Sequence, residues 1–186
     1  MAVFMISGPD RVGKDTQARN LKRHLEERGN LVHMLHYSAI KGDDIENRSK
    51  ELYRQMFGMI RFSEQNKFSL ILNRAHEGET IYGKLYRGYD AEWVYDLEKE
   101  YQRYLTNMVL FTFVDSAENL IAREDGLSFT TDIAKKTQEV ELFTKFNERS
   151  HIPFKQLIDI RNADEKKVWQ YMLEYLTYIK STNAKV

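Results

Sequence analysis

The chain contains no cysteine and only two prolines among its 186 residues. Without cysteine, disulfide bridges and thiolate metal sites are excluded. The scarcity of proline and the lack of any repeat or low-complexity linker fit the single domain that this length predicts. Among the five histidines only His33 and His36 approach a zinc-ligand spacing. That pair stands in an alternating apolar and polar segment, which favours ordinary strand side chains.

An excess of charge of one sign is also missing, because 28 Lys and Arg residues balance 28 Asp and Glu residues. Sequence-independent binding to long nucleic acids usually shows a basic excess, so a nucleic-acid partner is disfavoured, although a local patch stays open. No apolar run is long enough to span a membrane, and residues 1–6 lack the basic flank of a signal peptide. These absences predict a cytoplasmic protein without a membrane partner.

What the sequence does contain is a glycine-bounded segment near its start, Gly8-Pro9-Asp10-Arg11-Val12-Gly13-Lys14-Asp15-Thr16. It follows a short apolar run, residues 2–6, and precedes a helix-like stretch, as the G-x-x-x-x-G-K phosphate loop does. The glycines let successive N–H groups point at a polyphosphate, and Lys14 reaches the outer phosphates. The segment predicts binding of a nucleoside triphosphate. The predicted contacts are Gly8, Asp10, Arg11, Val12, Gly13, Lys14, Asp15 and Thr16.

Asp15 departs from the usual loop, in which Ser or Thr follows the lysine and its hydroxyl ligates Mg²⁺. A carboxylate is a hard oxygen ligand, so Asp15 is a candidate to hold Mg²⁺ directly or through water. Its charge beside the phosphates is tolerable only with the ion present. The alternative is a degenerate loop that no longer binds nucleotide, and both glycines, Lys14 and the strand–helix context argue against it.

Short apolar segments alternate with amphipathic ones along the rest of the chain. Strands are predicted over residues 2–6, 31–37, 68–72, 108–114 and 156–160. Helices are predicted over residues 14–28, 43–66, 90–104, 117–123, 132–149 and 164–180. The alternation predicts an α/β fold with three layers, α/β/α, around a five-stranded parallel sheet. Ligands bind at the carboxyl ends of such strands, where the phosphate loop, Tyr37, Asn73, Arg74 and Asp115 are expected to gather.

Three segments resemble thymidylate kinases. The phosphate loop matches the family pattern G-x-D-x-x-G-K-S/T-T-Q at Asp10 and Thr16-Gln17. Residues 70–74 stand where the family ends its third strand in Asp-Arg, and residues 73–90 are similar to the thymidylate-kinase-like and deoxynucleotide kinases of phages. The resemblance implies a P-loop fold and transfer of phosphate from ATP, with Mg²⁺, to a (deoxy)nucleoside monophosphate, with dTMP or another deoxynucleotide the leading acceptor. It also implies a homodimer and, for a phage-encoded protein, the host cytoplasm.

Two departures from that family lie on the acceptor side. Its Arg-Glu-Pro segment is replaced by residues 37–42, and the aspartate of the Asp-Arg pair is Asn73. The departures keep two alternatives open. One is a P-loop kinase acting on another acceptor, such as a nucleoside, a modified base or a DNA end. The other is an ATP-dependent switch that is not a kinase, although no effector-binding tail is visible to support it.

On the donor side, Lys14 and Mg²⁺ neutralise charge on the moving phosphoryl group. The resemblance implies a catalytic role for Arg11, because one thymidylate-kinase type carries an arginine there and lacks basic residues in its lid. The candidate lid, residues 123–136, has an acidic stretch, residues 124–128, after Arg123, which is a candidate nucleotide contact. The alternative for Arg11 is a solvent-facing loop residue. Asn162 follows the last strand, where such kinases contact adenine, or belongs to an ordinary turn.

On the acceptor side, Arg74 at a strand end is placed to clamp a phosphate bidentately, or else to cap the strand. The segment of residues 73–90 is dense in polar and aromatic side chains, which suits a grip on base and phosphate as well as a plain surface excursion. Its candidate contacts are Glu79, Tyr82 and Arg87.

Five further residues are candidates, and four of them have a simple structural alternative. Tyr37 and Phe62 are candidates to stack on the acceptor base, against core packing. Arg48 is a candidate for the acceptor phosphate, against an exposed helix cation. Asp115 is a candidate to order magnesium waters, against a helix cap. Asp10 resembles a family residue that orders the active site and contacts both ligands.

Overall fold

The computed structural model of the protein describes residues 2–37, 40, 42–126 and 128–182. Three residues of the segment that replaces Arg-Glu-Pro, Ser38, Ala39 and Lys41, lie outside the described residues. So does Leu127 of the candidate lid.

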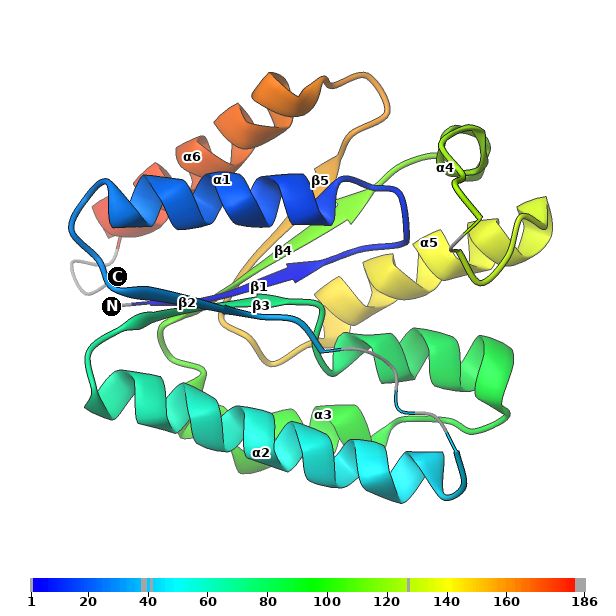
Figure 1. Ribbon diagram of the computed structural model, residues 1–186, viewed down its shortest axis with the longest axis horizontal. Coiled ribbons are helices and arrows are strands. Elements are labelled where there is room, and N and C mark those ends of the chain that lie inside the picture. Colours follow the sequence, from blue (N-terminus) through cyan, green and yellow to red (C-terminus); the bar gives the residue numbers. More distant parts are fainter. Residues whose placement is uncertain (1, 38–39, 41, 127, 183–186) are drawn as a thin grey trace.

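Five strands form one parallel sheet in the order β2-β3-β1-β4-β5 (Figure 1). The strands are β1 (Val3–Ser7), β2 (Val32–Leu35), β3 (Ser69–Asn73), β4 (Met108–Val114) and β5 (Phe154–Asp159). The predicted α/β fold with a five-stranded parallel sheet is confirmed. Because β1 lies between β3 and β4, the loop that follows β1 opens where three carboxyl ends meet, which is where ligands bind on such sheets.

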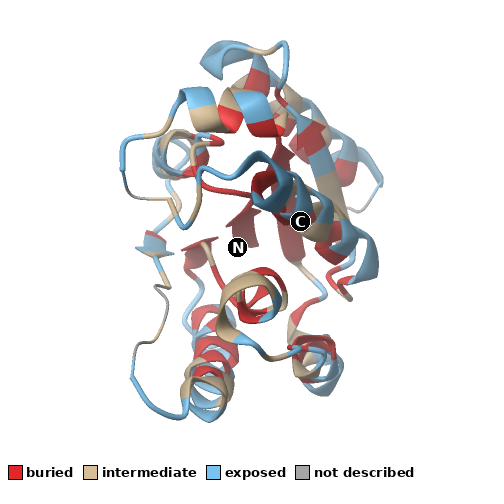
Figure 2. Ribbon diagram, turned by 90° about the vertical axis from the view of Figure 1, so that its right-hand side faces the viewer, coloured by how far each residue is buried: buried red, intermediate tan, exposed pale blue. Residues whose placement is uncertain are grey.

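Helices cover both faces of the sheet. In Figure 1, α1 (Lys14–Glu26) and α6 (Glu165–Thr182) lie on one side, and α2 (Ile45–Gln65) and α3 (Trp93–Glu100) on the other. The remaining helices are η1 (Glu79–Arg87), η2 (Gln102–Tyr104), α4 (Ala117–Ala122) and α5 (Ile133–Arg149). Figure 2 shows buried residues in the sheet and on the inward side of the helices.

Side chains of the central strands alternate between two hydrophobic cores. Met5 and Leu110 belong to the core under α2, α3 and α5, whereas Phe4 and Phe111 belong to the core under α1 and α6. Strands β1, β3 and β4 are buried along their whole length. This burial on both faces explains why the sequence shows them as nearly continuous apolar runs.

The segment of residues 73–90, expected as a loop, contains a helix. Residues Glu79–Arg87 form the π-helix η1, a rare element found often at functional sites. The prediction was wrong because Gly78, Gly83 and Gly88 resemble turn signals. In the folded chain a Cβ atom at Gly83 would lie 2.8 Å from Cε2 of Tyr89, so the glycine makes room for a packed ring. Tertiary packing thus decides the local structure here.

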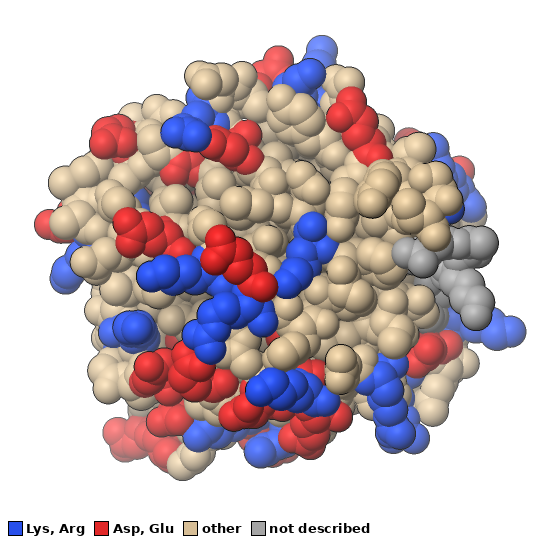
Figure 3. Space-filling model, turned by 180° about the vertical axis from the view of Figure 1, so that it is seen from behind, with Lys and Arg blue, Asp and Glu red and all other residues tan. Residues whose placement is uncertain are grey.

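Other differences concern boundaries. The helix expected over residues 90–104 divides into α3 and the short η2, and the strand expected over residues 31–37 ends at Leu35. The last four residues of the candidate lid are already the first turn of α5. Among the described residues no helix is both long and apolar enough to cross a membrane. On the face shown in Figure 3, acidic and basic side chains are interspersed.

Candidate functional site

The phosphate loop joins β1 to α1 in a conformation that requires its two glycines. Gly8 has a φ of +139°, and a Cβ atom there would lie 2.4 Å from the carbonyl oxygen of Phe113. Gly13, which directly precedes α1, has a φ of +84°. Arg11 also has a positive φ, 69°, although it is not glycine. Such strained residues concentrate at functional sites.

Lys14 is buried against its own loop, with 5% of its surface exposed. Its Nζ donates hydrogen bonds to the carbonyl oxygens of Gly8 (2.7 Å) and Pro9 (2.6 Å). No carboxylate of the described residues lies within ion-pair distance of Nζ. Burial, with a further contribution from the positive charge of Arg74, lowers the pKa of Lys14 to about 8. The ammonium group therefore lacks the anion that its environment favours.

Asp15, in the first turn of α1, contacts the end of β3. The side-chain amide of Asn73 donates a 2.6 Å hydrogen bond to Oδ1 of Asp15. Burial acts to raise the pKa of Asp15, but this hydrogen bond and the charges of Arg74 and Lys14 lower it overall. The carboxylate is therefore held ionised.

Three arginines around the loop are paired with carboxylates. Nη2 of Arg74 lies 3.1 Å from Oδ1 of Asp10, while Nε of Arg74 is buried without a hydrogen-bond partner. Arg11 pairs with Asp125 of the lid. Arg74, like Arg11, has a positive φ, 69°. These pairs place two arginine side chains at the carboxyl ends of β1 and β3, each held by one carboxylate.

The third of these arginines, Arg123, links the start of the lid to the loop. It pairs with Asp115, and its Nη1 donates a 3.1 Å hydrogen bond to the carbonyl oxygen of Arg11. Oδ1 of Asp115 also accepts from the backbone N–H of Ser116 (2.7 Å) and from the amide of Asn119 (2.8 Å). The carboxylate of Asp115 is thus engaged in the turn before α4, whereas the helix cap itself is Ser116, whose Oγ accepts the N–H of Asn119 at 3.2 Å.

A cavity of about 50 Å³ opens beside the loop, toward η1. Its floor includes Gly8 and Lys14, and its walls carry two arginines and several aromatic rings. The wall residues are Tyr37, Tyr53, Arg74, Ala75, Glu77, Gly78, Glu79, Tyr82, Arg87, Phe129 and Phe143. Burial raises the pKa of Tyr53 and of Tyr82 well above the ordinary value, so both hydroxyls stay protonated.

Arg87 is held in this wall by η1 itself. Its Nη1 donates to both carboxylate oxygens of Glu79, at 2.8 and 2.7 Å. The hydroxyl of Tyr89 donates to the same carboxylate. The Glu79 side chain is almost fully buried, so the charged pair is fixed in the cavity wall. The other guanidinium nitrogens of Arg87 make no hydrogen bond to the described residues.

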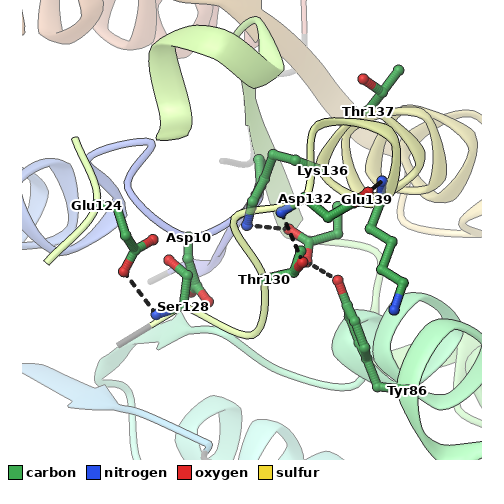
Figure 4. Close-up of polar contacts among 12 residues, drawn as sticks. Asp10, Tyr86, Glu124, Ser128, Thr130, Asp132, Lys136, Thr137 and Glu139 are labelled. Atoms are coloured by element: carbon green, nitrogen blue, oxygen red, sulfur yellow. Dashed lines mark hydrogen bonds and ion pairs between the residues drawn. The ribbon is translucent and has the colours of Figure 1, made fainter. Parts of the chain in front are cut away.

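The lid packs over the cavity through Phe129. The ring of Phe129 stacks on Tyr82 (4.8 Å between centroids) and on Tyr86 (5.1 Å). Figure 4 shows Tyr86 directed toward α5, where its hydroxyl donates a 2.5 Å hydrogen bond to Glu139. In the same view Glu124 accepts the N–H of Ser128, one of several backbone contacts of its carboxylate that shape the lid turn.

A second cavity, of about 320 Å³, lies on the other side of the loop between α1 and the turn before α6. Its lining residues are Arg11, Val12, Gly13, Thr16, Gln17, Arg123, Ile160, Ala163, Glu165 and Val168. Its volume falls in the range of small-molecule pockets. The loop therefore runs between two hollows, each lined by residues of its own.

The structure brings most of the predicted site residues to these two cavities. Gly8, Lys14, Tyr37, Arg74, Glu79, Tyr82 and Arg87 line the first, and Arg11, Val12, Gly13, Thr16 and Arg123 line the second. At the strand ends, Asp10 pairs with Arg74, and Asn73 donates a hydrogen bond to Asp15.

Besides Asp10, Asp15, Asn73 and Asp115, three predicted residues line neither cavity. Arg48 is exposed in the first turns of α2, and Asn162 is exposed next to Ala163 of the second cavity. Phe62 lies near the far end of α2 against Phe68, so its proposed stacking on a base was wrong. A side chain there is separated from the carboxyl ends of the strands by the length of the helix.

Of the other residues that line the first cavity, four with larger side chains were not among the predicted contacts: Tyr53, Glu77, Phe129 and Phe143. Tyr53 and Phe143 follow the same helical spacing as the core, so no sequence signal separates them from packing residues. Glu77 is buried and accepts the N–H of Ala75 at 2.8 Å. Its position two residues before Glu79 was the available signal.

The sheet order and the loop define the fold of P-loop nucleoside monophosphate kinases. Among solved structures, the chain is similar to thymidylate kinase from Candida albicans, with a TM-score of 0.60 and 13% sequence identity. The match covers 98% of this chain and 93% of that one. At the level of sequence, neither a family model nor a curated protein matches the chain. At this identity the likeness shows the fold, and it gives no support to a phage origin.

Proposed function

We propose that the protein transfers a phosphoryl group from ATP to a (deoxy)nucleoside monophosphate, with dTMP or another deoxynucleotide as the leading acceptor. The observation that carries this proposal is that Lys14 and Gly8 of the phosphate loop form the floor of the cavity whose walls contain Arg74 and Arg87. A phosphate-binding loop and an arginine-lined pocket share one surface, which is the geometry that an in-line transfer between two phosphates needs.

On the donor side, the triphosphate lies along residues 8–14 and the base enters the cavity beside Thr16 and Arg123. Lys14 exchanges its backbone carbonyl partners for phosphate oxygens, and Arg11 leaves Asp125 to stabilise the charge of the transferring group. Asp15 and the triphosphate hold Mg²⁺, which neutralises charge on the phosphates when bound. Mg²⁺ sites of this kind use one or two carboxylates with the substrate phosphates.

On the acceptor side, Arg74 and Arg87 bind the monophosphate, and Tyr37 and Tyr82 contact the nucleoside. Arg74 is available because a phosphate replaces Asp10 as its partner, and Arg87 binds with the nitrogens that Glu79 leaves unused. The present cavity of about 50 Å³ is smaller than a nucleotide requires, so Phe129 and the lid must move to admit the acceptor. Closure of the lid then excludes water from the transfer.

The test is ADP release from Mg-ATP in the presence of a panel of ribo- and deoxyribonucleoside monophosphates. The blank is Lys14→Ala. The matched control is Lys22→Ala in the same helix; this lysine is partly exposed and pairs with Glu26. We expect one or a few monophosphates to raise the rate of ADP release. This stimulated rate should fall by roughly a hundredfold or more in Lys14→Ala and stay unchanged in Lys22→Ala.

An ADP release rate that no monophosphate raises above the acceptor-free rate would contradict a monophosphate acceptor. A steady acceptor-independent rate that Lys14→Ala abolishes would point to an ATP-dependent switch instead. Stimulation by nucleosides or DNA ends alone would retain the kinase and change its acceptor.

A further inference from the structure

Asp15 and Asn73 each replace the residue that is usual at their position in such kinases, and their side chains contact each other. One is Asp15, in place of the usual Ser or Thr, and the other is Asn73, at the strand end where the related kinases have Asp. They are 58 positions apart in the sequence, and in the fold Nδ2 of Asn73 lies 2.6 Å from Oδ1 of Asp15. Two unusual residues that bond to each other call for one explanation.

In P-loop enzymes, Mg²⁺ is held by the loop Ser or Thr and by an Asp at the end of a neighbouring strand. Such a pair contains one hydrogen-bond donor and one carboxylate, with a net charge of −1. In this chain the pair again contains one donor, the Asn73 amide, and one carboxylate, that of Asp15. The charge is unchanged, but donor and carboxylate have exchanged places between the loop and the strand.

We propose that Asp15 and Asn73 form a single exchanged unit, in which Asp15 supplies the carboxylate for the divalent cation and Asn73 positions it. The inference rests on the proposed function only for the binding of a Mg²⁺–nucleotide, and it does not depend on the acceptor. Asn73 is a positioning residue in this scheme, because it acts through the carboxylate that it holds.

The surroundings of Asn73 fit a positioning role. It is 4% exposed and ends β3 in register with Ile6 of β1, next to the phosphate loop. The following residue donates its N–H to the carbonyl oxygen of Ile6 at 3.1 Å, which fixes the backbone on both sides of the side chain. The Asn73 amide is therefore held in place by its own backbone, and its hydrogen bond fixes the position of the Asp15 carboxylate.

The two side chains also present unused oxygens. Asp15 is exposed, and its second carboxylate oxygen accepts no hydrogen bond within the part of the chain that the structure describes. Oδ1 of Asn73 is buried and has no hydrogen-bond partner. Buried polar atoms are usually hydrogen-bonded, so this oxygen, which lies beside a carboxylate, is open to a donor such as a water molecule. A hydrated divalent cation meets both needs, since its waters donate hydrogen bonds while its charge attracts the carboxylate.

If the two residues have exchanged roles, each single substitution should be harmful and the double substitution should compensate. Asp15→Ser alone leaves two donors and no carboxylate, whereas Asn73→Asp alone brings two carboxylates to within hydrogen-bond distance. The double variant Asp15→Ser with Asn73→Asp again has one donor and one carboxylate, now in the usual places. If the residues form one unit, the double variant should need less Mg²⁺ to bind the nucleotide than either single variant.

The experiment measures binding of the non-hydrolysable ATP analogue AMP-PNP by titration calorimetry at increasing Mg²⁺ concentrations, without any acceptor. For Asp15→Ser and for the size-matched Asp15→Asn, we expect the half-saturating Mg²⁺ concentration to rise by about tenfold or more. For the double variant we expect it within about threefold of the unmodified protein. Thermal unfolding in EDTA gives a second readout. Asn73→Asp should lower Tm there, Mg²⁺ alone should restore it, and the double variant should not show the loss.

If Asn73→Asp does not fold, the double variant must fold, because it removes the repulsion, and rescue of folding supports the proposal. Two results would overturn it. One is an unchanged Mg²⁺ requirement in Asp15→Ser. The other is a double variant whose Mg²⁺ requirement is as high as the combined single effects. A protein that passes these tests but transfers phosphate to no monophosphate would overturn the proposed acceptor and leave the exchanged pair standing.

Discussion

Lys14 donates a 2.7 Å hydrogen bond to the carbonyl oxygen of Gly8, so the phosphate loop is closed on its own lysine. The bond places a buried ammonium group where no carboxylate of the described residues pairs with it. Burying this unpaired charge is unfavourable, and it lowers the pKa of Lys14 to about 8. Sites that bind an anion often lower the stability of the ligand-free protein in this way.

Replacing Lys14 should therefore stabilise the nucleotide-free protein while abolishing its activity. We expect Lys14→Met to raise the free energy of unfolding by about 1 kcal/mol, measured by urea denaturation without nucleotide. Lys22→Met, on the exposed side of the same helix, should change it by less than about 0.5 kcal/mol. A loss of stability in Lys14→Met would show that the hydrogen bonds to Gly8 and Pro9 outweigh the burial of the charge.

The approach of Gly8 to Phe113 predicts intolerance of any side chain at this position. Gly8→Ala would bring Cβ to within 2.4 Å of a backbone oxygen of β4, which cannot move without disturbing the sheet. We expect a loss of about 2–4 kcal/mol of stability, or displacement of the loop with loss of nucleotide binding. The control is Gly58→Ala in α2, where the added Cβ meets nothing within 4 Å and should add about 0.5–1 kcal/mol. Normal stability together with normal binding in Gly8→Ala would contradict the geometry of the loop.

The buried pair in η1 predicts strong coupling between Glu79 and Arg87. Arg87→Met leaves a buried carboxylate with only the Tyr89 hydroxyl, and we expect it to cost about 3 kcal/mol. Glu79→Gln in the same chain should recover part of that loss, because it removes the unpaired charge. Urea unfolding of both single variants and the double variant measures the coupling. Additive effects would show that the pair does not hold the cavity wall together.

A second buried cluster predicts the acid sensitivity of the fold. Oε1 of Glu98 lies 2.7 Å from Nε2 of His76, and Oε2 accepts the N–H of His151 at 2.6 Å. Burial acts to raise the pKa of Glu98, but these partners lower it overall. A lowered pKa in the folded state means that the ionised group contributes stability above its ordinary value of 4.5. This contribution is lost as pH falls below that value.

We therefore expect Glu98→Gln to be less stable than the unmodified protein at pH 7 and to lose less stability on acidification. Thermal unfolding between pH 7 and pH 3 measures both effects. Glu100→Gln, an exposed carboxylate at the end of the same helix, serves as the control. Parallel Tm profiles for Glu98→Gln and the unmodified protein would refute this assignment.

The contact of Phe129 with Tyr82 and Tyr86 predicts a role for the lid in excluding water. Given the proposed function, Phe129→Ala should lower acceptor-dependent transfer by about tenfold and raise hydrolysis of ATP relative to it. Phe62→Ala is a matched control, since the two phenylalanines are 50% and 51% exposed and Phe62 lies away from both cavities. Equal ratios of transfer to hydrolysis in the two variants would remove Phe129 from the lid mechanism.

Much of the fold could be predicted from the sequence, because its central strands are buried on both faces and appear as apolar runs. The position and conformation of the phosphate loop could be predicted for a similar reason, since Gly8, Gly13 and Lys14 keep a fixed spacing that reflects backbone geometry. The cavity between this loop and η1 could not. Tyr53 has the spacing of a core residue, and the packing of the Tyr89 ring against Gly83 of the π-helix is not visible in the sequence. The bond between Asp15 and Asn73 depends on strand register, which only the folded sheet provides.

The two cavities beside the phosphate loop have no lining residue in common. Given the proposed function, the two ligands are recognised largely by separate stretches of chain, with α6 and its preceding turn on one side and η1 with α2 on the other. Substitutions in one stretch can change the preferred ligand without disturbing the other. The architecture is modular in this sense, so acceptor preference can diverge, or be redesigned, while the donor stays constant.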